Sequence, residues 1–246
     1  MTTGSIGDDS PFAFTFANLR RYYESALENG YRVITCRDWA EGIRPAPGLK
    51  LMVNRVDIDV APKKTRRLAE IFSDLGIPAT FFVRLHANEY NPFSFEHYRC
   101  FRALVEAGHE IGLHSEIVDQ AAIWREPAEV CLRRDLRVLS EMLGVPIRGV
   151  ASHGGLTGLN NLDFWKTRAA EEFGLLYEAY DDSPRFGLFK RSFYLSDSNW
   201  SSWKCYENGV VRPDDRRTPN EHFAEGHEVV YLLIHPETYY DDHFYE

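Results

Sequence analysis

The 246-residue sequence lacks the features of membrane, disulfide-rich and dinucleotide-binding proteins. No uninterrupted apolar run approaches the roughly 18 residues that a membrane-spanning helix needs. Cysteine occurs only four times and never as a CxxC pair, so the sequence predicts reduced thiols rather than a disulfide scaffold. No GxGxxG motif follows the first predicted strand, which weighs against a dinucleotide-binding fold.

Positive charge is also scarce. Lysine and arginine number 28 against 37 aspartates and glutamates, which gives a formal net charge of −9. Because such a chain repels phosphate backbones, no nucleic-acid partner is expected. Residues 1–12 have neither the basic start nor the apolar stretch of a secretory signal, so we predict a flexible tail there and a cytoplasmic protein. A second, acidic tail is expected at 241–246, and the sequence leaves the oligomeric state open.

Between the tails, predicted strands alternate with predicted helices. Strands are expected where β-branched and apolar residues are dense: 31–36, 49–59, 79–83, 110–113, 146–152 and 228–234. Helices are expected where apolar residues recur every three or four positions, with glycine or proline at the ends: 16–29, 63–75, 95–107, 127–143 and 161–173. The alternation of predicted strands and helices becomes irregular from 175 to 217. The alternation predicts a single α/β domain over residues 13–240, built as a (β/α) barrel around a parallel sheet.

Titratable residues stand where several of these strands end. In (β/α) barrels the chemistry lies at the carboxyl ends of the strands. One predicted strand ends in Asp57 and Asp59, and three others run into His114, His153 and His235. We therefore expect one site with two carboxylates and three imidazoles. The other six histidines are expected on the surface or beside helices, without a role: His86, His97, His109, His222, His227 and His243.

Asp57 and Asp59 alternate along one strand, so both side chains point the same way. Two carboxylates this close repel each other unless a cation neutralises them, and the cation leaves one of them free to act as a base. Asp59 alternatively caps the helix that begins near Pro62. Carboxylate and imidazole together suit Zn²⁺, with Mn²⁺, Fe²⁺, Co²⁺ and Ni²⁺ as alternatives.

Four segments resemble the polysaccharide deacetylase (NodB-homology, carbohydrate esterase 4) superfamily. They are RVDID at 55–59, DLGIPATFFV at 74–83, AGHEIGLHSE at 107–116 and VVYLLIHPE at 229–237. SHGG, YLSDSNWSSW and HPETYY are similar to a divergent, deacetylase-like subgroup. The resemblance spans roughly residues 16–240. It implies a distorted seven-stranded (β/α) barrel of the glycoside hydrolase/deacetylase type.

The resemblance also implies roles for individual residues. Asp57 corresponds to the catalytic base, Asp59 and His114 to metal ligands, and His235 to the general acid. The chain departs from the family pattern at Val118, which stands where a second ligand histidine is usual. His153 is expected to supply this missing ligand.

Other residues are candidates for support or substrate contact. Glu116 or Asp119 is the alternative to His153 as the third ligand. Asp197 is expected to orient His235 or Arg148, or else simply to form a turn. Arg148 stands in RGVASHGG, which replaces the family's usual Arg-Pro-Tyr motif. Trp200 belongs to a group of aromatics that either stack on a sugar ring or cover the barrel end.

Together these features predict a metal-dependent hydrolase of an amide C–N bond. The expected reaction is de-N-acetylation of an N-acetylated sugar during surface polysaccharide biosynthesis, with an acylated sugar or glycan as the partner. One alternative is an allantoinase-like enzyme that hydrolyses a non-peptide C–N bond in a small metabolite. The other is a degenerate, non-catalytic carbohydrate-binding protein. Metal content separates the last alternative from the two enzymes, because only the enzymes need the ion.

Overall fold

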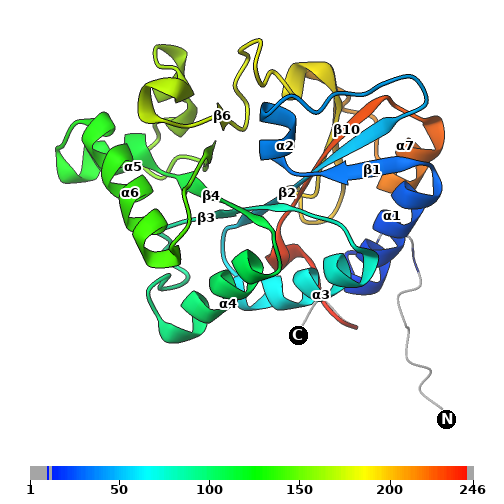
Figure 1. The fold of residues 1–246 in the computed structure, drawn as a ribbon, viewed down its shortest axis with the longest axis horizontal. Helices are drawn as coiled ribbons and strands as arrows, with labels where there is room; N and C mark the ends of the chain where they lie inside the picture. The colour runs from blue at the N-terminus through cyan, green and yellow to red at the C-terminus, as the bar shows by residue number, and fades with distance from the viewer. Residues whose placement is uncertain (1–9, 11–12, 243–246) are drawn as a thin grey trace.

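A ten-stranded, mostly parallel sheet organises the computed structural model, which describes residue 10 and residues 13–242. Its order is β6-β5-β4-β3-β2-β10-β7-β8-β9, and β1 pairs with β2 off this path (Figure 1). Every pairing is parallel except β7 with β8 and β8 with β9, which are antiparallel. In chain order the strands are β1 (Tyr31–Ile34), β2 (Lys50–Ile58), β3 (Thr80–Val83), β4 (Glu110–Ser115), β5 (Gly149–Ser152), β6 (Tyr177–Glu178), β7 (Phe193–Ser196), β8 (Lys204–Glu207), β9 (Val210–Val211) and β10 (Val229–Ile234).

Helices cover this sheet. They are α1 (Phe16–Glu28), α2 (Cys36–Ala40), α3 (Thr65–Leu75), α4 (Phe95–Glu106), α5 (Ile117–Trp124), α6 (Ala128–Leu143) and α7 (Pro219–Glu225). Short 3₁₀ segments lie at Pro62–Lys64, Asn161–Lys166, Ala170–Phe173, Phe189–Arg191 and Pro236–Thr238. In Figure 1, α3 and α4 lie on one side of β2 and β3, and α2 lies on the other. No helix in the described ranges is long and apolar enough to cross a membrane.

β2 is the central strand and is nine residues long. β10 pairs along one edge of it, and the other edge is shared, with β1 beside 50–53 and β3 beside 55–58. All of its residues except the first are buried. Because both edges and both faces are covered, β2 holds the residues at its carboxyl end in fixed positions.

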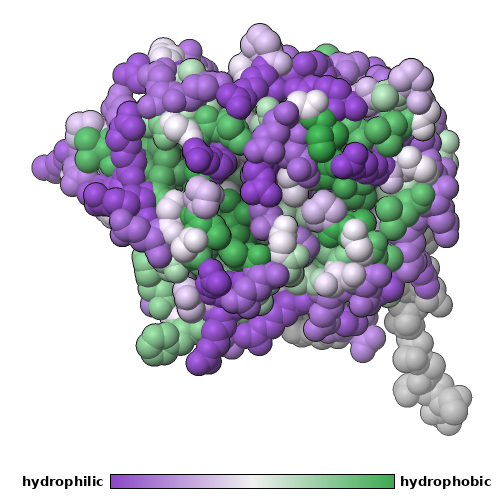
Figure 2. All heavy atoms as spheres, in the orientation of Figure 1, coloured by the Kyte–Doolittle hydropathy of each residue, from purple (hydrophilic) through white to green (hydrophobic). Residues whose placement is uncertain are grey.

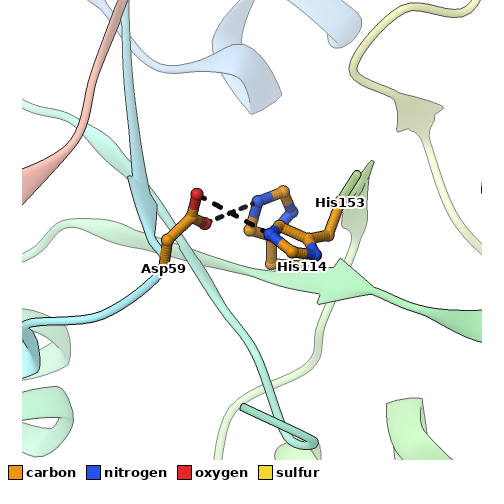
Figure 3. A group of neighbouring side chains, drawn as sticks. All are labelled: Asp59, His114 and His153. Atoms are coloured by element: carbon orange, nitrogen blue, oxygen red, sulfur yellow. Dashed lines mark ion pairs between the residues drawn. The ribbon is translucent and has the colours of Figure 1, made fainter. Parts of the chain in front are cut away.

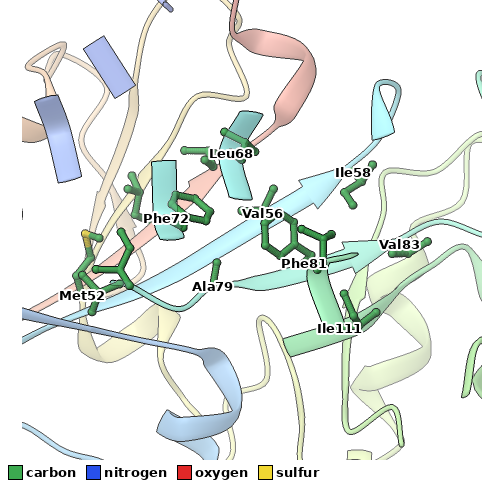
Figure 4. Packing of buried hydrophobic residues seen from close by; sticks show 14 of the residues in the cluster. Met52, Val56, Ile58, Leu68, Phe72, Ala79, Phe81, Val83 and Ile111 are labelled. Atoms are coloured by element: carbon green, nitrogen blue, oxygen red, sulfur yellow. The ribbon is translucent and has the colours of Figure 1, made fainter. Parts of the chain in front are cut away.

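The side chains of β2 alternate between two apolar cores. Met52, Val56 and Ile58 pack with Leu68 and Phe72 in an outer core beneath the helices (Figure 4). Leu51 and Val53 face an inner core that α2 closes with the Trp39 side chain. By the same alternation, Arg55 and Asp57 project to the inner side of the sheet. Arg55 and Asp57 therefore lie inside the barrel, whereas Asn54 faces the helices and accepts a hydrogen bond from Tyr23 of α1.

The opening between β6 and β7 is bridged by a loop rather than by strand pairing. The Phe186 ring stacks on Tyr177 of β6 at 4.6 Å, and Phe189 lies 5.1 Å from Tyr194 of β7. The Trp39 indole donates a hydrogen bond to the Phe186 carbonyl at 2.7 Å. The barrel is distorted here because aromatic side chains fill the gap in its wall.

The predicted α/β class with a mostly parallel sheet is confirmed, as is the single domain. The sheet has ten strands rather than seven, because β8 and β9 extend it as an antiparallel hairpin and β1 shares an edge of β2. The predicted helix at 161–173 is wrong. That segment forms two 3₁₀ turns, and the first begins at Asn161, whose buried side chain is bonded to Asp119.

The predicted tails fall largely outside the described residues: 1–9 and 11–12 at one end, and 243–246 at the other. The face of the molecule shown in Figure 2 is covered mainly by hydrophilic residues, with apolar ones visible between them. The buried apolar residues form two cores.

Candidate metal centre

Three of the predicted residues converge at the carboxyl edge of the sheet. Asp59 follows β2, His114 lies near the end of β4, and His153 follows β5. His114 Nε2 lies 3.1 Å from Asp59 Oδ1, and His153 Nε2 lies 3.7 Å from Asp59 Oδ2 (Figure 3). Bonds of about 2.0–2.1 Å in a tetrahedral arrangement place ligand atoms about 3.3–3.4 Å apart. The three side chains therefore have the spacing of a metal-ligand set.

A backbone contact sets the tautomer of His114. Its Nδ1 lies 2.9 Å from the carbonyl oxygen of Ala151, which can only accept a hydrogen bond. Nδ1 therefore carries the proton, and Nε2 faces Asp59. Burial lowers the pKa of His114, but Asp57 and Asp59 outweigh it, so the net pKa is raised. Positive charge is therefore favoured at this point, as a cation site requires.

Glu116 and Arg84 support His153 from behind. His153 Nδ1 lies 3.2 Å from Glu116 Oε1, which also accepts a hydrogen bond from the Arg84 guanidinium at 2.8 Å. Arg84 further donates to the backbone carbonyl of Asp59 at 2.8 Å. Burial opposes ionisation of Glu116, yet His153 and Arg84 keep its pKa below the usual value. Glu116 thus contacts the candidate ligand His153 on the side away from Asp59, and it is not one of the three converging residues.

Asp119, the other alternative ligand, is occupied elsewhere. Its carboxylate accepts hydrogen bonds from the backbone of Leu156 and Thr157, from the Thr157 hydroxyl and from the Asn161 amide. It therefore holds the loop that follows His153. Val118, at the position of the missing histidine, packs against the outer core. Of the three candidates for the third ligand, the structure brings only His153 to Asp59 and His114.

Asp57 forms a buried bidentate ion pair with Arg55. Arg55 Nε and Nη2 lie 2.8 and 2.7 Å from the two carboxylate oxygens. The guanidinium also lies 4.7 Å above the Tyr180 ring. Burial raises the pKa of Asp57, but Arg55, His114 and His235 outweigh it and lower the net pKa. Sequence reasoning missed Arg55, although an arginine two residues before Asp57 on a buried strand was the available signal.

Asp197 orients His235 and not Arg148. Its Oδ1 lies 2.6 Å from His235 Nδ1, and its Oδ2 accepts the backbone N–H of His235 at 2.9 Å. Burial lowers the pKa of His235, but Asp197 and then Asp59 outweigh this and raise it to about 10. His235 is therefore protonated near neutral pH. Its Nε2 faces the centre, 3.8 Å from Asp59 Oδ2.

The structure does not bring Arg148 to this site. Arg148 directly precedes β5 and is exposed, with its guanidinium donating to the Gly174 carbonyl, whereas His153 follows the other end of that strand.

Trp200 is 54% exposed on the turn after Asp197, and Trp203 and Tyr239 are buried. Trp203 and Tyr239 therefore belong to the outer core and cannot stack on a sugar ring. His109 lies between α4 and β4 and His222 lies on α7, which agrees with the expectation that they stand beside helices, and both are buried.

No protein-family model matches the sequence, and no curated protein does. The solved proteins that the structure matches at low sequence identity include the following three. One is a mutant of BA3943, described as a CE4 family pseudoenzyme with restored enzymatic activity, whose wild type is from Bacillus anthracis (16% identity, TM-score 0.46). The second is IcaB from Ammonifex degensii (21%, 0.42), and the third is the Streptococcus pyogenes deacetylase PplD in complex with acetate (11%, 0.43).

These are likenesses of fold. The alignments cover 80%, 63% and 72% of this chain, and 62%, 73% and 76% of BA3943, IcaB and PplD respectively. The chain thus spans less than two thirds of the length of BA3943.

Proposed function

We propose that this protein is a metal-dependent hydrolase that removes the acetyl group from an N-acetylated sugar. The supporting observation is the convergence of Asp59, His114 and His153, flanked by the anionic Asp57 and the protonated His235. Asp59 Oδ1 is buried and makes no hydrogen bond to any described residue. A carboxylate oxygen left in this way beside two imidazoles fits a bound divalent cation, and the donor set suits Zn²⁺.

When bound, the cation would polarise the amide carbonyl and lower the pKa of water. The remaining chemistry belongs to side chains of this chain. Asp57 takes a proton from the attacking water, because Arg55 keeps it ionised and fixes both of its oxygens. Arg55 holds both Asp57 oxygens, and Oδ2 also lies 3.4 Å from His114 Nε2. Asp59 and Asp57 thereby have different roles, although they share one face of the strand.

His235 acts on the leaving amine. Asp197 accepts a hydrogen bond from His235 Nδ1–H and holds the imidazole in place, so Nε2–H points toward the centre. An imidazolium placed there donates its proton to the amine nitrogen as the C–N bond breaks. Water attack assisted by Asp57 and proton donation by His235 together account for hydrolysis of an amide.

A second candidate is a non-catalytic sugar-binding protein. Val118 favours it, because a ligand histidine is usual at that position. The position of His153 favours the enzyme, because it restores a three-residue ligand set from another strand.

Acetate release tests the proposal. The zinc-reconstituted chain is incubated with N-acetylglucosamine oligosaccharides and, separately, with ureides and cyclic amides. We expect acetate only from the first group and none from Asp57→Asn, which keeps the size of the side chain. Half-buried His97 on α4, which is not among the residues of the centre, provides the control variant, His97→Ala, which should match wild type in acetate release. Turnover of ureides without acetate release would instead establish the small-metabolite activity, and no turnover at all with metal bound would favour the binding protein.

A further inference from the structure

A second cluster of ligand-type side chains lies at the other end of β10. His227 precedes this strand and His235 follows it, so roughly 25 Å of extended chain separates the cluster from the candidate metal centre. The cluster comprises His222 and Glu225 on α7, and His227. Nothing in the proposed hydrolysis uses these residues.

Local structure explains why the three side chains meet. His222 and Glu225 are three residues apart on α7 and therefore share a face of the helix. Gly226 ends the helix with a φ of 81°, a left-handed conformation that turns the chain back toward β10. His227 is thereby brought against the same face. Phe193 of β7 fixes both rings, with its centroid 4.3 Å from His222 and 4.1 Å from His227.

Two imidazole nitrogens in this cluster are buried and make no hydrogen bond to any residue in the described part of the chain. They are His222 Nδ1 and His227 Nε2. Both face Glu225 Oε2, at 3.6 and 3.1 Å. These separations bracket the roughly 3.3–3.4 Å expected between ligand atoms around a tetrahedral ion. His222 is wholly buried, so an unpartnered nitrogen on it carries a free-energy cost that a ligand would remove.

The surrounding residues hold the three ligand atoms in a suitable state. His222 Nε2 lies 3.4 Å from Asp215 Oδ1, so it can keep its proton and leave Nδ1 with a free lone pair. Arg217 pairs with Asp215 and also contacts Oε1 of Glu225, which leaves Oε2 for the histidines. Glu225 and His227 line an open cavity of about 480 Å³. A fourth coordination position can therefore open to solvent.

We propose that His222 Nδ1, His227 Nε2 and Glu225 Oε2 form a second divalent-metal site, which takes Zn²⁺ or another cation that prefers imidazole ligands. Two imidazoles and one carboxylate with an open position make a recognised zinc set. The ion links the end of α7 to the start of β10. An alternative ligand set consists of Cys205, Asp215 and the other nitrogen of His222. We favour the first set, because Arg217 already holds both oxygens of Asp215.

Metal stoichiometry tests this site independently of the first. The full chain is stripped with a chelator and titrated with Zn²⁺ by calorimetry, and with Co²⁺ by absorption spectroscopy. We expect two ions in wild type and one in either His227→Ala or Glu225→Gln, which alter partly exposed side chains. Asp59→Ala should lose only the other ion. If the first site does not exist, wild type binds one ion and His227→Ala binds none, so the two proposals fail separately.

Two further variants sharpen the result. Asp215→Asn should weaken the second ion about 10- to 100-fold, as loss of a supporting carboxylate does. Cys205→Ser should keep it. Unchanged stoichiometry in both His227→Ala and Glu225→Gln overturns the site, and loss of the ion in Cys205→Ser overturns the assignment of Nδ1. Thermal unfolding of each metal-free variant checks that the chain is folded.

Discussion

Arg55 and Asp57 lie two positions apart on the same face of β2 and form a bidentate ion pair that is almost wholly buried. The two residues lie on the same strand, so the pair is set by the backbone of β2 itself. Strand alternation alone points both side chains inward. The ion pair with Arg55 distinguishes the proposed base, Asp57, from the proposed ligand, Asp59, which lies two residues further along the chain.

Arg55→Lys should therefore reduce the catalytic activity while leaving the binding of the metal largely unchanged. A lysine keeps the charge but cannot hold both carboxylate oxygens. We expect kcat to fall by at least about tenfold while the metal content stays at the wild-type value. Steady-state kinetics beside metal analysis checks this. Loss of metal together with activity would show that Arg55 supports the ligands instead.

Arg55→Met should destabilise the fold. It leaves Asp57 buried without its partner, and breaking a buried pair in this way costs about 3–5 kcal/mol. The free energy of unfolding from denaturant titration measures the effect. Adding Asp57→Asn should recover part of the loss, because the unpaired charge is then gone. No recovery in the double variant would contradict the explanation.

The pair of Asp197 and His235 predicts a pH dependence. The pKa of His235 is raised to about 10, so the protonated form persists below that pH and is lost as the pH rises through it. Burial lowers the pKa of His235, and the negative charge of Asp197 is the main influence that raises it. Asp197→Asn removes that charge. The alkaline limb of the kcat profile should then move to lower pH. An unmoved alkaline limb would exclude His235 as the general acid.

Glu116→Gln should weaken the metal centre without removing it. The amide cannot supply the negative charge that faces His153 Nδ1 and Arg84. We expect metal affinity to fall about 10- to 100-fold. Competition with a chromophoric chelator measures it. A complete loss of the ion, equal to that in Asp59→Ala, would mean that Glu116 is a direct ligand.

Two glycines offer a matched test of packing in the barrel. A Cβ on Gly149 of β5 would lie 2.2 Å from the Tyr177 ring, whereas one on Gly154 meets nothing within 4 Å. Gly149→Ala should therefore lose about 1–3 kcal/mol of stability, and Gly154→Ala should stay within about 0.5 kcal/mol. Denaturant titration of both variants compares them. Equal stabilities would mean that Tyr177 moves aside freely.

Sequence patterns predicted the long elements and the position of the site. β2, β10 and α6 have strong apolar patterns with clear ends, and each was predicted to within a few residues. Asp57 and His114 lie near the ends of strands of the parallel sheet, and Asp59, His153 and His235 follow such strands, so the fold brings all five to one edge. α2 was missed because its five residues show no helical repeat, and its start depends on a capping box at Thr35 and Asp38.

The supporting residues could not be predicted in the same way. Arg84 reaches Glu116 and the Asp59 carbonyl across separate strands, a relationship that depends on the register of the sheet. Arg148 was misplaced because it was read as part of the motif that ends in His153, although it stands at the opposite end of β5. His222 was given no role because α7, which carries it, was not predicted.

Metal content in a chain with one site removed tests the central claim most directly. In a His227→Ala background, only the centre of Asp59, His114 and His153 should remain, and elemental analysis should find one ion per chain. Adding Asp59→Ala or His153→Ala should remove that ion and, with it, acetate release. If the ion persists in both double variants, or if acetate is released without it, this centre is not the metal-dependent site proposed here.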